Sequence, residues 1–141
     1  MTPLQALQQT LAGEHAAVYV YGVLGARVPA SAHRSLGTRL MSAYTTHRAR
    51  RDHLSGLVRA AGGRPVAAEV SYRVPNAART VGELDAAALL VERRCASVYA
   101  AAVGSTAGSD RRWAVDALTD CAVRQLSFGG SPSSFPGAGD L

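Results

Sequence analysis

The chain has 141 residues, 48% of them hydrophobic, which is enough for one domain with a buried core. Only 6% of the residues are aromatic and alanine is the main apolar residue, a composition typical of closely packed helices. The net charge of +5 comes from scattered arginines, with no lysine, and this scatter argues against a nucleic-acid-binding surface.

The cysteine and hydropathy patterns predict where the protein is found. Cys95 and Cys121 each fall in a helical pattern, so we expect buried, reduced thiols and no disulfide. The N-terminus lacks the basic stretch followed by an apolar core that is typical of a signal peptide. No apolar run reaches the roughly 18 residues that a membrane span needs. We therefore expect a cytoplasmic protein with a single domain over residues 1–141.

The first predicted helix covers about residues 3–28. Thr2 and Gln5 form a capping box around Pro3, and Pro29 ends the helix. One face carries Leu4, Leu7, Leu11, Glu14, Val18, Tyr21 and Leu24, spaced by three and four residues. Residues 16–24 are apolar on the opposite face as well. That second face predicts either a packed loop or a homodimer.

The second predicted helix covers about residues 31–61, ends at Gly62-Gly63, and has His47 near its middle. Residues 62–79 then show no helical period and contain two prolines. An extended segment of this length can span a whole bundle, so we predict a crossover that makes the second and third helices parallel. Its alternating side chains, Val66, Val70, Tyr72 and Val74, can lie along the apolar back of a helix.

The third predicted helix, about residues 80–103, starts at a capping box of Thr80 and Glu83. A short turn follows, and the fourth helix covers about residues 110–128, capped by Ser109 and Asp110. The irregular tail, about 129–141, carries Phe135, which we expect to pack against the bundle. The first and third connections between helices are short, and the second is long. This order predicts an all-α, up-down-down-up four-helix bundle with one long crossover.

Each predicted helix carries one ionisable residue near its middle: Glu14, His47, Glu92 or Asp120. In three helices this residue lies on the inward stripe, and Glu92 lies beside it. A carboxylate on an apolar helix face has to be paired, bound to a metal or neutralised, because a lone buried charge is very costly. We therefore expect these four side chains to meet at one level of the bundle.

Residues 2–137 resemble an uncharacterised ferritin-like family of high-GC bacteria, a domain of unknown function. The similar segments are GEHAAVYVYGVLGARV, HRARRDHL, PVAAEVSYRVP, ALTDCAVRQ and the closing FPG. The resemblance implies a ferritin-like bundle. The wider superfamily implies oxygen-using di-iron or di-manganese chemistry when its ligand set is intact.

That ligand set is a glutamate on each of two helices and a Glu-x-x-His pair on each of the other two. Glu14 and Glu92 match the two lone carboxylates. The pairs do not match, because His47 is followed three residues later by Arg50, and Asp120 by an apolar residue. Residues three apart share a helix face, so Arg50 places a permanent positive charge where a ligand is needed.

These departures favour a non-catalytic bundle in which a buried ion-pair network replaces the di-metal site. The network would contain Glu14, His47, Arg50, Glu92, Asp120 and Arg124. The alternative is a single-metal site with fewer ligands than a di-metal centre, binding iron, manganese or zinc. The protein would then be a metal-dependent oxidoreductase or an iron-handling protein. The candidate ligands of this metal site are Glu14, His47, Glu92 and Asp120. A basic protein that associates with nucleic acid is the third hypothesis.

Other polar residues give weaker signals. His15 is interpreted as a core or interface histidine rather than a ligand, and His33 as a solvated residue near a helix start. Asp52 and His53 are adjacent, so on a helix their side chains diverge and do not form an acid–base pair. The tyrosines are interpreted as packing residues: Tyr19, Tyr21, Tyr44 and Tyr99. No nucleophile motif, phosphate loop or cysteine-pair zinc spacing is present.

Overall fold

Four α-helices form the protein in a computed structural model that describes residues 1–29 and 31–140. They are α1 (Pro3–Arg27), α2 (Arg34–Ala60), α3 (Val81–Ser105) and α4 (Gly108–Ser127), followed by a short 3₁₀ helix, η1 (Ala138–Asp140). Among the described residues there is no β-strand. The prediction of an all-α four-helix bundle is confirmed.

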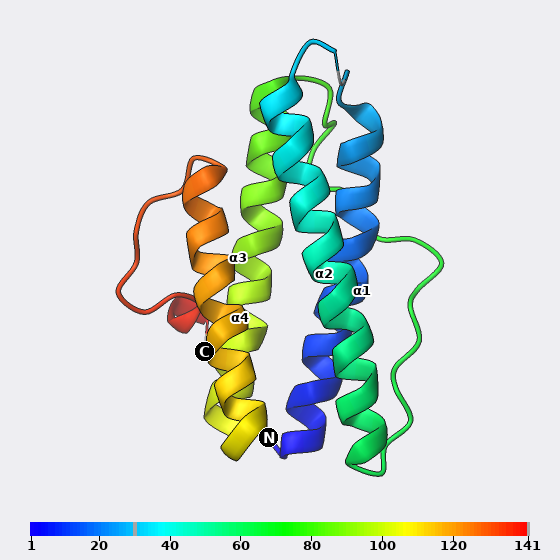
Figure 1. Ribbon diagram of the computed structural model, residues 1–141, viewed down its shortest axis with the longest axis vertical. Coiled ribbons are helices and arrows are strands. Elements are labelled where there is room, and N and C mark those ends of the chain that lie inside the picture. Colours follow the sequence, from blue (N-terminus) through cyan, green and yellow to red (C-terminus); the bar gives the residue numbers. More distant parts are fainter. Residues whose placement is uncertain (30, 141) are drawn as a thin grey trace.

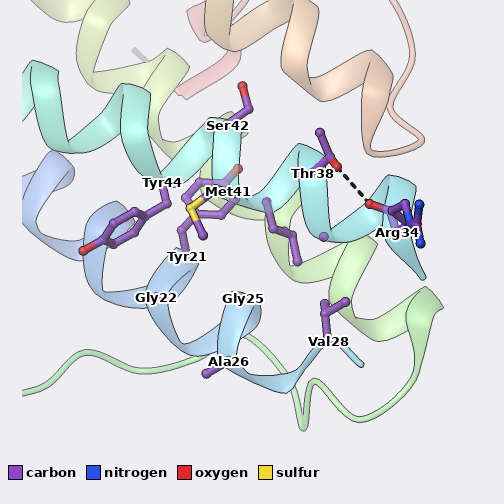
Figure 2. Close-up of a pocket in the computed structure, with 12 residues that line it drawn as sticks. Tyr21, Gly22, Gly25, Ala26, Val28, Arg34, Thr38, Met41, Ser42 and Tyr44 are labelled. Atoms are coloured by element: carbon purple, nitrogen blue, oxygen red, sulfur yellow. Dashed lines mark hydrogen bonds between the residues drawn. The ribbon is translucent and has the colours of Figure 1, made fainter. Parts of the chain in front are cut away.

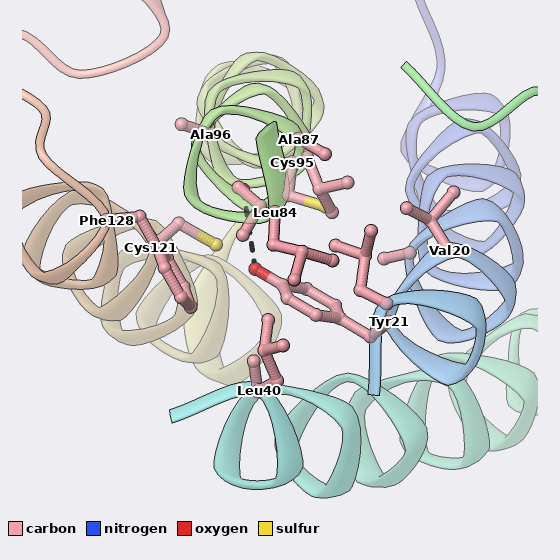
Figure 3. Close-up of a cluster of buried hydrophobic side chains, with 14 of the residues drawn as sticks. Val20, Tyr21, Leu40, Leu84, Ala87, Cys95, Ala96, Cys121 and Phe128 are labelled. Carbon is pink, nitrogen blue, oxygen red and sulfur yellow. Dashed lines mark hydrogen bonds between the residues drawn. The ribbon is translucent and has the colours of Figure 1, made fainter. Parts of the chain in front are cut away.

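The helices alternate in direction around the bundle. Figure 1 shows α1 and α4 leading away from the end where the N-terminus lies, whereas α2 and α3 lead toward that end. Helix α1 packs against α2 and α3, and α3 packs against α4. Figure 3 shows the helices around the core in the order α1, α2, α4, α3. Each helix is therefore antiparallel to both of its neighbours.

Local sequence signals account for two of the helix starts. Thr2 accepts a hydrogen bond from the backbone N–H of Gln5, and Thr80 accepts one from Glu83, so both predicted capping boxes form. Helix α2 instead starts at Arg34, three residues later than predicted, because the backbone N–H groups of Ala32 and His33 bond to the Pro29 carbonyl before the helix begins.

Helix α4 begins earlier than predicted. Its N-cap is Ala107, which makes no side-chain hydrogen bond, so Ser109 and Asp110 are not the caps but lie inside the first turn. There the Asp110 carboxylate is near the positive end of the helix dipole, a favourable position for an acid.

The core consists of two buried clusters. The smaller one contains Leu7, Leu11, Leu54 and Val58, between α1 and α2. The larger one draws side chains from all four helices and includes many alanines, which let the helix axes approach. Figure 3 shows Tyr21 reaching from α1 across this larger cluster, above Leu40 of α2 and toward α3.

The segment between α2 and α3 runs along α1. The Gln8 side chain donates to the Arg64 carbonyl and accepts from the Val66 N–H, at 2.6 and 2.8 Å. Farther along, Arg27 donates to the Ala77 carbonyl at 2.7 Å, and the rings of Tyr19 and Tyr72 lie 5.6 Å apart. This crossover therefore covers one face of α1.

Three apolar side chains outside the helices do not lie where we expected. Val66 was predicted to lie along the back of a helix, but it is 39% exposed. Val70 is fully exposed because the crossover bends at this residue. Phe135 is 78% exposed, whereas Phe128, at the end of α4, fills the core position instead. The tail contacts α3 through Gly137, where a Cβ atom would lie only 2.4 Å from the Ala96 carbonyl oxygen. Backbone contact, rather than the Phe135 ring, holds the tail in place.

The crossover leaves part of α1 uncovered on the side of α2. An open groove of about 870 Å³ lies between the second half of α1 and the first half of α2 (Figure 2). Its lining includes Gly22 and Gly25 of α1, Val28 just after α1, and the exposed Met41 of α2. Within the described chain, none of the helices combines the length and apolar character required to cross a membrane.

Candidate functional site

Glu14, His47 and Glu92 meet in the middle of the bundle, and all three side chains are completely buried. His47 extends from α2 between the two glutamates of α1 and α3. Its Nδ1 lies 2.7 Å from Glu14 Oε2, and its Nε2 lies 3.0 Å from Glu92 Oε1. One histidine thus bridges two carboxylates, with a hydrogen bond at each ring nitrogen.

Two tyrosine hydroxyls complete this arrangement. Tyr21 donates to Glu92 Oε1, and Tyr99 donates to Glu14 Oε1, each at 2.5 Å. In both α1 and α3 the tyrosine follows the glutamate by seven residues, which is two helical turns and the same face. Because the helices are antiparallel neighbours, each tyrosine reaches the glutamate of the other helix. We call these five side chains the inner layer.

The inner layer holds His47 in its protonated form. Burial alone would lower the pKa of His47, but the charge and hydrogen bond of Glu14, followed by those of Glu92, outweigh burial and raise it to about 9. An imidazolium has two N–H donors, which matches the two carboxylate oxygens that face it. The Tyr21 ring stacks on the imidazole at 5.3 Å.

Both tyrosines remain protonated in this environment. Burial, followed by the charge of the neighbouring glutamate, raises the pKa of Tyr21 and of Tyr99. Their hydroxyls are therefore donors, and the chain of hydrogen bonds runs without interruption from Tyr99 through Glu14, His47 and Glu92 to Tyr21.

Arg50, Asp120 and Arg124 form a second group beside the inner layer, which we call the outer layer. Asp120 Oδ2 accepts hydrogen bonds from Arg50 at 2.7 Å and from Arg124 at 2.8 Å. Arg124 also donates to Thr46 of α2 at 2.8 Å. Burial would raise the pKa of Asp120, but the bond from Arg124 and the charge of Arg50 lower it below its usual value.

Arg50 links the two layers. Its guanidinium lies over the Tyr99 ring, 5.5 Å from the centroid, and also donates to Cys121 Sγ at 3.4 Å. The Arg50 side chain is 10% exposed, against 39% for Asp120. The structure thus places all six predicted residues in two adjacent groups, with Asp120 bonded to arginines rather than to His47.

A possible metal-ligand cluster overlaps the inner layer. One ligand atom each of Glu14, His47 and Cys95 lie within 4.8 Å of one another, and all three residues are buried. Among the described residues, Glu92 Oε2 has no hydrogen-bond partner. Burial, followed by the charge of Glu14, raises the pKa of Cys95, so its sulfur is a neutral thiol. Metal binding here would require Cys95 and His47 to lose protons.

Sequence reasoning missed three of these contributors: Tyr21, Tyr99 and Cys95. The repeated Glu-x₆-Tyr spacing in residues 14–21 and 92–99 was the available signal for the tyrosines. Cys95 follows Glu92 by three residues and therefore shares its face. No such signal identifies which glutamate each tyrosine contacts, because that depends on the packing of two helices.

The remaining polar candidates lie apart from this site. His15 contacts the Val66 carbonyl at 3.0 Å, on the crossover side of α1. The His53 ring packs on Trp113 at 4.5 Å, whereas Asp52 pairs with Arg51. His33 is exposed at the start of α2. None of these four side chains enters the inner or the outer layer.

The fold and this site define an all-α four-helix bundle with ionisable side chains at its centre. Residues 6–140 match the family described as Domain of unknown function (DUF4439), and the chain belongs to that family. It is also similar to the crystal structure of a conserved hypothetical protein, Rv2844, from Mycobacterium tuberculosis. The two share 28% sequence identity over 94% of each chain, with a TM-score of 0.82. No curated protein matches the chain.

Proposed function

We propose that this protein is a ferritin-like bundle in which a buried ion-pair network takes the place of a di-metal centre, and that it acts by binding rather than by catalysis. The course of the four helices supports the ferritin-like assignment, since two short turns and one long crossover are typical of that topology.

The observation that carries the proposal is the position of His47. Both ring nitrogens already bond to Glu14 and Glu92, so the atoms that would bind a cation instead satisfy one another. Across the two layers, three carboxylates face three cationic groups, namely the His47 imidazolium, Arg50 and Arg124. A divalent ion would have to displace protons and then lie close to Arg50, whose charge repels it.

The second candidate is a single-metal site with fewer ligands than a di-metal centre. Glu14, His47 and Cys95 lie close enough to hold one ion, and Glu92 Oε2 offers a further free oxygen. Mixed oxygen, nitrogen and sulfur ligands suit zinc or iron. A bound iron would supply redox chemistry and make the protein a metal-dependent oxidoreductase.

Elemental analysis distinguishes the two candidates. Protein purified without chelator is expected to hold less than about one transition-metal ion per ten chains, because its ligands are protonated and paired. Added Zn²⁺, Mn²⁺ or anaerobic Fe²⁺ should leave the melting temperature unchanged, since only an ion that binds the folded state raises it. One ion per chain in the native protein, lost in Cys95→Ala but retained in a Cys121→Ala control, would instead establish the metal site.

A cytoplasmic location, a homodimer and association with nucleic acid stay predictions. The groove between α1 and α2 is the apolar surface on which the homodimer expectation now rests. A gel shift that persists at physiological salt would be required to support nucleic-acid binding, because non-specific binding to phosphates weakens steeply as salt rises.

A further inference from the structure

A second cavity, of about 220 Å³, lies between α1, α3 and the crossover. Its walls are apolar: Ala17 and Val20 come from α1, and Val91 and Val98 from α3. Tyr72 of the crossover lines it as well. The cavity is thus formed where the crossover passes over the junction of two packed helices.

Two arginines line this otherwise apolar space, Arg73 from the crossover and Arg94 from α3. Both are exposed, and within residues 1–29 and 31–140 neither forms an ion pair with a carboxylate. The other cavity-lining residues carry no acidic side chain. Two unpaired guanidinium groups repel a cation and favour an anion, and their planar donors match the two oxygens of a carboxylate.

The volume limits the size of the anion. Liquid water occupies about 30 Å³ per molecule, so the cavity has the volume of roughly seven waters, comparable to a short aliphatic chain. Apolar walls with a few converging polar groups are typical of a small-molecule site. We propose that this cavity binds a short-chain aliphatic monocarboxylate, with the chain between α1 and α3 and the carboxylate at Arg73 and Arg94.

The site is separate from the ion-pair network, although Cys95 lines the cavity and also lies beside Glu14 and His47. Val20 and Cys95 lie on the facing helices α1 and α3 in Figure 3. Metal content at the inner layer and carboxylate binding in the cavity therefore test independent statements, and either can fail without the other.

Calorimetric titration with hexanoate tests the proposal, with hexan-1-ol as the uncharged probe of the same chain length. A ligand of this size is expected to saturate one site at about millimolar concentration, and hexan-1-ol should bind at least tenfold more weakly. The double variant Arg73→Gln/Arg94→Gln should weaken hexanoate binding by at least tenfold. Arg93→Gln, an exposed arginine of α3 outside the cavity lining, is the matched control and should leave binding unchanged.

A second variant tests the binding of the ligand's aliphatic chain rather than that of its carboxylate. Ala16 also lines the cavity, so Ala16→Leu should occupy its space and abolish hexanoate binding while both arginines remain. Circular dichroism melting of each variant establishes that it is folded. The proposal is overturned if hexanoate shows no saturable binding up to about ten millimolar. It is equally overturned if hexan-1-ol binds as tightly, or if the folded double variant binds hexanoate like the wild type.

Discussion

The inner and outer layers contain similar chemical groups but differ in their access to water. Glu14, His47 and Glu92 are completely buried, whereas the Asp120 side chain is 39% exposed and that of Arg124 is 17% exposed. Water cannot replace a missing partner in the inner layer, but it can do so in part around Asp120. The same kind of ion pair should therefore matter for stability in one layer and contribute little in the other.

The largest effect is expected for Glu14→Ala. This change removes the acceptor of His47 Nδ1 and of the Tyr99 hydroxyl and leaves these two donors buried without a partner, although His47 Nε2 keeps its bond to Glu92. We expect the free energy of unfolding to fall by about 3–5 kcal/mol, measured by urea denaturation. Glu69→Ala, at an exposed crossover position, is the control and should be neutral. Unchanged stability of Glu14→Ala would contradict the assignment of the inner layer as a tightly coupled network.

The next effect concerns pH. The pKa of His47 is 6.5 in the unfolded chain and about 9 in the folded one, so the folded state holds this proton more tightly. The resulting stability is fully present below pH 6.5 and is lost as the pH rises through 9. It amounts to about 3 kcal/mol, since one pKa unit corresponds to about 1.4 kcal/mol. Denaturation midpoints measured from pH 6 to 10 should therefore decline.

Two variants test whether His47 causes the decline in stability with rising pH. His47→Gln should abolish the slope between pH 6.5 and 9, whereas His53→Gln, a change of an exposed histidine, should preserve it. Above pH 9 the raised pKa values of Cys95, Cys121 and Tyr99 add a further loss of the same sign, because the unfolded chain then releases protons that the folded chain retains. A flat profile from pH 6.5 to 9 in the wild type would mean that His47 is not the bridging cation.

The smallest effect is expected in the outer layer. Asp120→Asn weakens two bonds to arginines that water can partly replace, so we expect a loss of about 1 kcal/mol that shrinks in 1 M salt. Asp116→Asn, at an exposed position of the same helix, is the control. A loss as large as that of Glu14→Ala would remove the distinction between the layers.

Much of the fold follows from short-range patterns. The capping boxes at Thr2 and Thr80 and the proline-containing segment after Gly62 are local signals, so the helices and the crossover could be predicted from them. The level at which Glu14, His47 and Glu92 lie follows from their positions along the helices.

The partners within the site could not be derived in that way. Glu92 was expected beside the inward stripe, yet it is completely buried, because α3 packs against both α1 and α4 and therefore buries a wider face than one stripe. Tyr21 and Tyr99 were interpreted as packing residues, although each donates to a glutamate of the other helix. Such contacts depend on how neighbouring helices are rotated about their axes. The spacing of residues along the sequence does not determine that rotation.

The directions of the helices have a consequence for the charges at their centre. Since every helix is antiparallel to both neighbours, the peptide dipoles of adjacent helices oppose one another across the bundle (Figure 1). Glu14 and Glu92 also lie several turns from any helix end, where the field of a terminus no longer acts. The backbone therefore offers these carboxylates almost no compensation. Side-chain protons and guanidinium groups have to balance their charge, and this is why a histidine is held in its cationic form so far from water.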